Sequence, residues 1–154
     1  MSLIVKNGGK VVFGVGSWVS FNRKFSEADI RHFAEFLQDE DPVHFKLDQL
    51  KAMGFEKTFV YGAMLNSLFT KAYLSTFISP VYLSQSVNFL SPVYVDEEIE
   101  VRISVASVER TKSQKLKCSL ESTIRKIEKN VFAVTGTGLL LLKPETVVFE
   151  SRDS

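Results

Sequence analysis

A short acidic stretch holds the two side chains best suited to acid/base chemistry. It reads Asp39-Glu40-Asp41-Pro42-Val43-His44, so a carboxylate and an imidazole stand five residues apart in a loop that contains proline. Together, Asp39 and His44 could position one water molecule and move two protons. An acidic loop that follows a helix is also commonly a solvated turn. This stretch alone therefore leaves both interpretations open.

A second stretch, Tyr61-Gly62-Ala63-Met64-Leu65, opens a long apolar segment. The first amides of a helix lack partners inside the helix and carry a partial positive charge. Glycine lets a ligand approach the backbone closely. This combination suits an oxyanion, such as the enolate that forms from a thioester carbonyl. The alternative is that Gly62 simply begins a crowded helix.

A third stretch, residues 84–98, reads as a strand that runs into a proline turn and an acidic turn before the next strand. By itself it indicates structure and no chemistry. It gains meaning only from its order and spacing relative to the first two.

The elements that must position these stretches follow from hydrophobic periodicity and from turn residues. Ser26 and Asp29 form a capping box that starts a helix reaching about Gln38. Gly54 ends a two-turn helix, and Pro80 closes a long helix that begins at Gly62. The segments predicted as strands are 18–25, 81–90, 98–108, 115–127 and 131–142, with a tight hairpin loop at 128–130. The segment before residue 18 also reads as a strand.

This order of elements predicts an α+β protein of the hotdog type, in which an antiparallel sheet wraps around one long buried helix. The helix 62–79 is apolar nearly all the way round, which predicts burial on all sides. The segment 131–142 is apolar on both faces, so we expect a central strand covered on both sides. We expect one domain over 1–154, with a core of about 14–142. One such sheet leaves an open edge, so a homodimer or higher homo-oligomer is expected.

Composition excludes several classes of function. The 19 basic and 18 acidic residues give a net charge of +1 without a separate basic block, so no nucleic-acid partner is expected. No apolar stretch is long enough to span a membrane, and the N-terminus lacks the features of a signal peptide. These features favour a cytoplasmic location, with a mitochondrion or another organelle left open.

The reactive side chains outside the acidic stretch read as structural. The single cysteine, Cys118, rules out an intrachain disulfide and a zinc site built from cysteines. It shares an apolar face with Leu116 and Leu120, which predicts a buried thiol. His32 falls opposite the apolar stripe of its helix, so we expect it to be solvated. No metal or organic cofactor is implied.

Taken together, the three stretches resemble the MaoC-like family, which includes (R)-specific enoyl-CoA hydratases and type 2 hydroxyacyl-thioester dehydratases. That family's pattern is Asp-x-Asn-Pro-x-His, then a Val-His-Gly-Met type of helix start, then a Gln-x-x-Phe-x-x-Pro-Val type of strand. The resemblance covers roughly residues 14–142. The matching residues are Asp39, Pro42 and His44, then Val60, Gly62 and Leu65, then Gln85, Phe89, Pro92 and Val93.

The resemblance implies a hydro-lyase that acts on an acyl chain carried as a thioester by coenzyme A or acyl carrier protein. It implies that Asp39 and His44 activate the water and that the amide of Gly62 stabilises the enolate. It also places Asp41, Tyr61, Ala63, Met64 and Thr70 around the substrate. The hydroxyl of Thr70 either supports the catalytic pair or bonds the backbone of its own helix.

Three residues depart from the family pattern. Asp41 stands where the family has asparagine, Tyr61 where it has histidine, and Ala63 where it has methionine. An amide that can donate a hydrogen bond is thereby replaced by a carboxylate that cannot when ionised. A second carboxylate near Asp39 should oppose its ionisation and favour His44 as the cation.

Three other functions stay open at the level of sequence. The substitutions Asp41 and Tyr61 suggest a protein that binds acyl-thioesters with weak catalysis. A hotdog thioesterase would need a carboxylate on or near the long helix, whereas residues 62–79 contain neither Asp nor Glu. A module that binds only proteins would require the three matching stretches to be coincidental.

Overall fold

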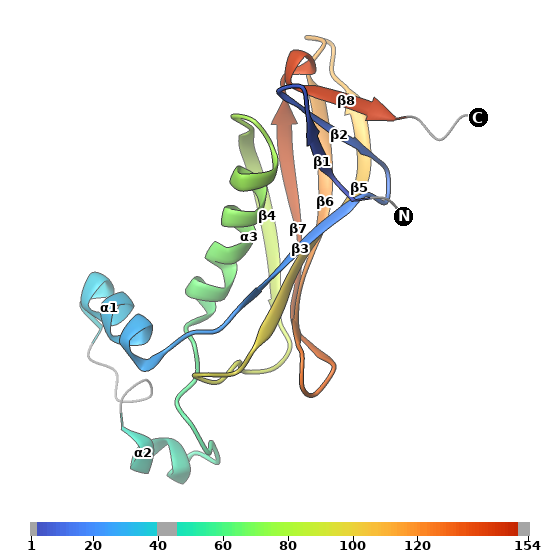
Figure 1. The fold of residues 1–154 in the computed structure, drawn as a ribbon. Coiled ribbons are helices and arrows are strands. Elements are labelled where there is room, and N and C mark those ends of the chain that lie inside the picture. The colour runs from blue at the N-terminus through green and yellow to red at the C-terminus, as the bar shows by residue number, and fades with distance from the viewer. Residues whose placement is uncertain (1–2, 40–45, 151–154) are drawn as a thin grey trace.

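The computed structural model describes residues 3–39 and 46–150. Over these residues the chain forms two β-sheets, three α-helices and one short 3-10 turn (Figure 1). In chain order, the elements are β1 (Val5–Asn7), β2 (Lys10–Gly14), β3 (Trp18–Arg23), α1 (Glu27–Leu37), α2 (Leu47–Ala52), α3 (Gly62–Thr76), β4 (Val81–Phe89), β5 (Ile99–Arg110), β6 (Leu116–Lys126), β7 (Val131–Leu142), η2 (Pro144–Thr146) and β8 (Val147–Glu150).

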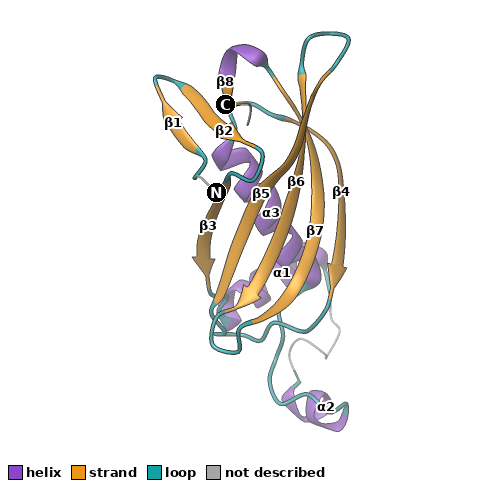
Figure 2. Cartoon of the chain, turned by 90° about the vertical axis from the view of Figure 1, so that its right-hand side faces the viewer, coloured by secondary structure: helices purple, strands orange, loops and turns teal. Residues whose placement is uncertain are grey.

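The larger sheet is antiparallel and has the strand order β3-β5-β6-β7-β4. It curves around α3, which lies against one face of the sheet (Figures 1 and 2). This confirms the predicted hotdog arrangement. β3 and β4 form the two edges of this sheet, and β7 lies inside it, as its apolar sequence predicts.

Alternation along the strands builds the core between the sheet and α3. On β5, Ile99, Val101 and Ile103 are fully buried while their neighbours in sequence are half-buried. Successive side chains of a strand point to opposite faces, so every second residue meets the helix. The helix contributes the buried residues Met64, Leu65, Leu68, Phe69, Ala72, Tyr73 and Thr76.

Gly138 on β7 makes room for the largest buried ring of the helix. A Cβ atom at this position would lie 2.6 Å from Cζ of Tyr73, much closer than real Cβ contacts. The Tyr73 hydroxyl is hydrogen-bonded to the Ser122 hydroxyl of β6, which is itself buried. The glycine, the tyrosine and the serine therefore lock α3 to the middle of the sheet.

The prediction that the long helix is buried on all sides is wrong. The side chains of Ala63, Ser67, Lys71 and Ser75, each four residues from the next, are exposed, and Leu74 is 56% exposed. The larger sheet covers one side of α3 and leaves these side chains on the uncovered part of the helix surface. The helix also ends at Thr76, three residues before the predicted end, because Phe77 takes an extended backbone and Ser79 a left-handed one.

The predicted covering of β7 on both faces is only partly right. Ala133, Val134, Leu140 and Leu142 are buried, whereas Leu139 and Leu141 on the other face are half-buried. One face of the sheet meets α3, and the opposite face is covered much less.

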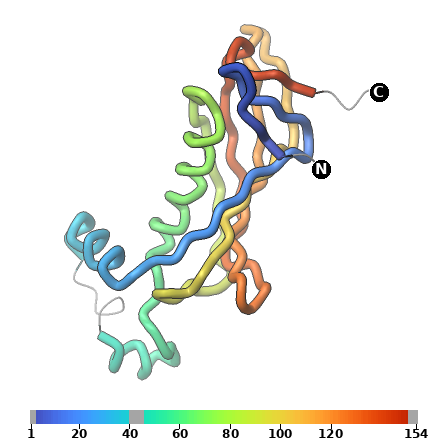
Figure 3. Tube along the Cα trace, in the orientation of Figure 1, coloured from blue at the N-terminus to red at the C-terminus, as the bar shows by residue number. Residues whose placement is uncertain are grey.

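The smaller sheet was not predicted. It has the order β1-β2-β8. β2 pairs in parallel with β8, so the pairing joins two segments near opposite ends of the sequence (Figure 3). Its residues Val11, Phe13 and Val147 belong to the same hydrophobic core as α3. Within the described ranges, no helix has the length and apolarity that a membrane span requires.

Candidate active site

Asp39 is held at the end of α1. Ser26 and Asp29 form the predicted capping box, with the Asp29 amide donating to Ser26 Oγ at 3.2 Å and the Ser26 amide donating to Asp29 Oδ2 at 2.8 Å. α1 ends at Leu37, and its C-cap residue Gln38 has a left-handed backbone with a φ of 54°, which stops the helix. The Asp39 amide then donates to the Ala34 carbonyl at 2.9 Å. The carboxylate is therefore anchored directly behind a well-capped helix.

Tyr61 joins Asp39 to the start of the central helix. It is the N-cap residue of α3 and is 8% exposed. Its hydroxyl donates to Asp39 Oδ2 at 2.8 Å, and its ring packs edge-on against Phe33 of α1, with centroids 5.2 Å apart. In Figure 1, α1 accordingly lies beside the end of α3 where that helix begins.

Gly62 follows Tyr61 directly and is the first residue of α3. The first turn carries no acidic side chain, so the positive end of the helix is not neutralised from within the turn. A Cβ at Gly62 would lie 3.0 Å from Cζ of Phe89, which shows how closely that ring approaches the backbone. A side chain at this position would compete with the ring for the same space.

An apolar cavity of about 290 Å³ opens beside Gly62. Its walls come from the second and third motif stretches, including Val60, Leu65, Phe89 and Pro92. The fold therefore brings the helix start and the strand with its proline turn together around one cavity. Phe89 was predicted only as a matching residue of the family pattern. Its place at the end of β4 gives no signal in sequence that it faces Gly62.

The other predicted site residues lie in different surroundings. Met64 is buried in the core and Ala63 is exposed on α3. Thr70 is hydrogen-bonded to the hydroxyl of Tyr82 on β4, which opposes the rise in the pKa of Tyr82 that burial causes. That tyrosine hydroxyl also donates to Oε1 of Gln85. Asp41 and His44 lie outside the described residues.

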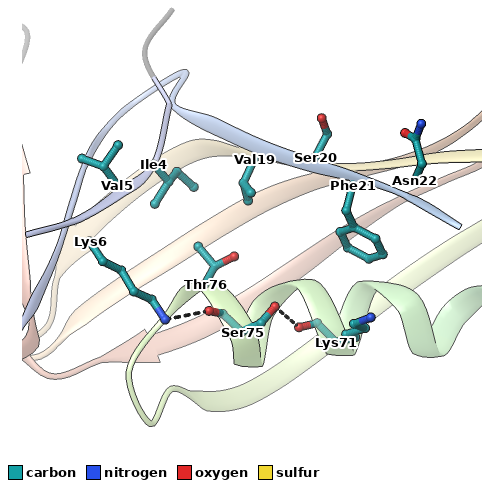
Figure 4. Close-up of a pocket in the computed structure, with 10 residues that line it drawn as sticks. All are labelled: Ile4, Val5, Lys6, Val19, Ser20, Phe21, Asn22, Lys71, Ser75 and Thr76. Atoms are coloured by element: carbon teal, nitrogen blue, oxygen red, sulfur yellow. Dashed lines mark hydrogen bonds between the residues drawn. The ribbon is translucent and has the colours of Figure 1, made fainter.

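Another cavity lies away from Gly62. It measures about 470 Å³ and lies between β1, β3 and the second half of α3 (Figure 4). Lys6 Nζ donates to the Ser75 carbonyl at 2.9 Å, and Lys71 Nζ lies 5.1 Å from the centre of the Phe21 ring. The ammonium groups of Lys6 and Lys71 thus both contact other residues of the fold. Among the described residues that line it there is no carboxylate or imidazole.

Cys118 and His32 match the sequence predictions. Cys118 is fully buried, and burial raises the pKa of its thiol to about 12, so it stays protonated at neutral pH. His32 is exposed on α1. In the described part of the chain, no group of three or more His, Cys, Asp or Glu side chains is placed to hold a metal ion.

Comparison with known proteins gives a consistent picture. The model of the MaoC like domain matches residues 15–130. The mitochondrial 3-hydroxyacyl-(acyl-carrier-protein) dehydratase of Arabidopsis thaliana is 34% identical over 105 residues, which cover 68% of this chain and 63% of that protein. The (R)-specific enoyl-CoA hydratase of Aeromonas caviae is 28% identical over 100 residues, covering 64% of this chain and 75% of that protein.

The solved structure of an (R)-hydratase from A. caviae involved in PHA biosynthesis has the same fold. It superimposes with a TM-score of 0.74 at 27% identity and covers 84% of this chain and 96% of that one. The family model spans about three quarters of the sequence. It includes Asp39, the start of α3 at Gly62, and the strand β4 with its proline turn, which lines the cavity beside Gly62. The chain belongs to the MaoC-like domain family.

Proposed function

We propose that this protein is a hydro-lyase that interconverts trans-2-enoyl-thioesters and (R)-3-hydroxyacyl-thioesters in fatty-acid metabolism. Asp39 and His44 form the acid/base pair, and the backbone amide of Gly62 binds the thioester oxygen. Asp41, Ala63, Met64 and Thr70 remain proposed as residues that shape the substrate site. The chain spans 63% of the length of the Arabidopsis thaliana dehydratase.

One observation carries the proposal. The hydroxyl of Tyr61 donates to Asp39 Oδ2 at 2.8 Å, and Tyr61 is the residue directly before Gly62. A carboxylate from the end of α1 and the amide end of α3 are thereby held in one site. Acid/base catalysis on a thioester needs a proton-transfer group near an oxyanion donor, because negative charge reaches the carbonyl oxygen as a proton moves.

In the hydration direction, the acid/base pair binds one water molecule. One member removes a proton from the water as its oxygen bonds to C3, and the C2–C3 double bond shifts its electrons toward the thioester carbonyl. The Gly62 amide donates to that oxygen while the enolate exists. The other member then gives a proton to C2, so the product gains one complete water. Dehydration follows the same steps in reverse.

The carrier of the acyl chain is proposed as coenzyme A or acyl carrier protein. The two relatives differ in this respect by name, one acting on a carrier-protein thioester and the other on a CoA thioester. The cavity beside Gly62 is lined mainly by apolar side chains, which suits an acyl chain. The cytoplasm is the proposed location, with a mitochondrion as the alternative, since the plant relative is mitochondrial by name.

We also propose that residues 1–154 form one domain that pairs with a second copy along β4. This strand is an open edge of the larger sheet, and an open edge presents unpaired backbone groups to another strand. Val81, Leu83, Phe89 and Leu90 are exposed apolar side chains along or just after this strand. Pairing would cover them. A higher oligomer would need a further contact between such pairs, because each copy has a single β4 edge.

A second candidate function is the binding of acyl-thioesters with little catalysis. The observation that favours it is the approach of the Phe89 ring to Gly62, which narrows the space in front of the amide. Tight binding of an acyl-CoA without turnover at any pH would select this candidate over the hydro-lyase.

The activity is tested with purified protein and crotonyl-CoA, by following the loss of the enoyl-thioester absorbance across pH. Longer enoyl-CoA chains are measured in parallel. We expect turnover in the parent and a loss of orders of magnitude in Asp39→Asn and His44→Ala, with melting temperatures about unchanged. Activity retained in Asp39→Asn would refute the proposed pair. Release of free CoA, detected with a thiol reagent, would indicate a thioesterase instead.

A further inference from the structure

We propose that Tyr61 is a positioning residue for Asp39: its phenol fixes the orientation of the catalytic carboxylate. The family resemblance places Tyr61 next to the substrate only. This inference rests on the proposed function, because it assigns Tyr61 a part in the same acid/base step.

The geometry holds Asp39 from both sides. Its backbone amide is bound to the Ala34 carbonyl of α1, and its Oδ2 accepts the Tyr61 hydroxyl from the start of α3. Tyr61 is itself immobilised, because its ring is buried against Phe33 and its backbone begins a helix. A carboxylate held by two helices keeps one orientation, which is what a proton-transfer group needs to meet its substrate.

The chemistry of the contact explains why the donor matters. A phenol hydroxyl that donates to the carboxylate stabilises the charged form that accepts a proton. The Tyr61 hydroxyl therefore supports both the orientation and the ionised state of Asp39.

The test compares steady-state kinetics on an enoyl-CoA that the parent turns over, for Tyr61→Phe and for Tyr73→Phe. Phenylalanine at position 61 keeps the ring against Phe33, so we expect the variant to fold. We expect its kcat to fall about 10- to 100-fold, as for a lost hydrogen bond to a charged group, with KM changed by less than about threefold.

A matched control distinguishes positioning from packing. Tyr73→Phe is the matched control: it also removes a buried tyrosine hydroxyl, far along the same helix, and should lower the melting temperature without lowering kcat. A merely structural role for Tyr61 would give the same result as Tyr73→Phe.

The outcomes separate this inference from the proposed function. If the parent is active and Tyr61→Phe keeps the parental kcat, or changes only KM, the positioning role is overturned. The proposed hydro-lyase activity then still stands. A parent without turnover on any enoyl-thioester overturns the proposed function, and this inference with it.

Discussion

Gly62→Ala offers a sharp test of where the thioester oxygen binds. The backbone at Gly62 is helical, so alanine is allowed there, and alanine raises helix propensity by up to about 1 kcal/mol over glycine. Against this, the new Cβ would lie 3.0 Å and 3.1 Å from two atoms of the Phe89 ring. That ring is 56% exposed and can move by a few tenths of an ångström. The two effects nearly cancel.

We therefore expect the free energy of unfolding of Gly62→Ala to change by less than about 1 kcal/mol, which shifts the melting temperature by roughly 2–4 °C at most. Activity should respond far more. The Cα–Cβ bond of a helical residue tilts toward the N-terminus, so the methyl group enters the space in front of the first amides. Losing one oxyanion donor costs about 100- to 1000-fold in kcat. Because the methyl group hinders the amide without removing it, we expect the kcat of Gly62→Ala to fall by at least about tenfold and by no more than about 1000-fold.

The assay combines thermal unfolding, followed by circular dichroism, with steady-state turnover of crotonyl-CoA. Phe89→Ala and the double variant serve as controls, because removing the ring relieves the contact but leaves the methyl group in place. Activity at the parental level in Gly62→Ala would refute the placement of the oxyanion site at this amide. A fall in melting temperature above about 10 °C would refute the reasoning that the ring gives way.

The remaining predictions concern the core, the buried thiol and the sheet edge. Gly138→Ala should destabilise the fold by roughly 1–3 kcal/mol, because its Cβ would overlap the buried Tyr73 ring. Denaturant unfolding measures this change, and an unchanged midpoint would contradict the packing described for Tyr73. Burial raises the pKa of both Cys118 and Tyr73 to about 12, from ordinary values of 9.0 and 10.0. The unfolded chain thus loses these protons first, so stability should be fully present below pH 9 and fall as pH rises toward 12, as urea titrations across pH would show. In the native protein Cys118 should resist iodoacetamide at pH 8 and react only after unfolding; rapid native alkylation would show that the thiol is accessible. Leu83→Glu on the β4 edge should convert a dimer to monomers, seen by sedimentation; a dimer that survives would place the interface elsewhere.

Local patterns were enough to predict most of the elements. The capping box at Ser26, the glycine stop at Gly54 and the alternation along β5 and β6 depend on neighbours in sequence, and the structure confirms each. Cys118 was assigned correctly for the same reason, because its face of β6 is apolar. The order of the predicted elements was enough for the hotdog arrangement, and the family resemblance added the proposed site near Gly62.

Contacts between distant segments were not readable in this way. The parallel pairing of β2 with β8 joins opposite ends of the chain, and both strands are too short to carry a strong periodic signal. The exposed stripe of α3 was missed because an apolar helix predicts burial without saying how much of it a single sheet can cover. The space that Gly138 leaves for Tyr73 depends likewise on two elements far apart in sequence.

The sequence by itself determined which residues could do the chemistry, since residue type and spacing single out Asp39 and His44 as the proposed acid/base pair and Gly62 as the helix start. Only the tertiary structure decided how Asp39 and Gly62 are held. Asp39 and Tyr61 are 22 residues apart, and their hydrogen bond exists because α1 packs against the first turn of α3. Phe89 reaches Gly62 because β4 returns along the helix. Such contacts depend on how whole elements pack, and no local pattern of side chains encodes that.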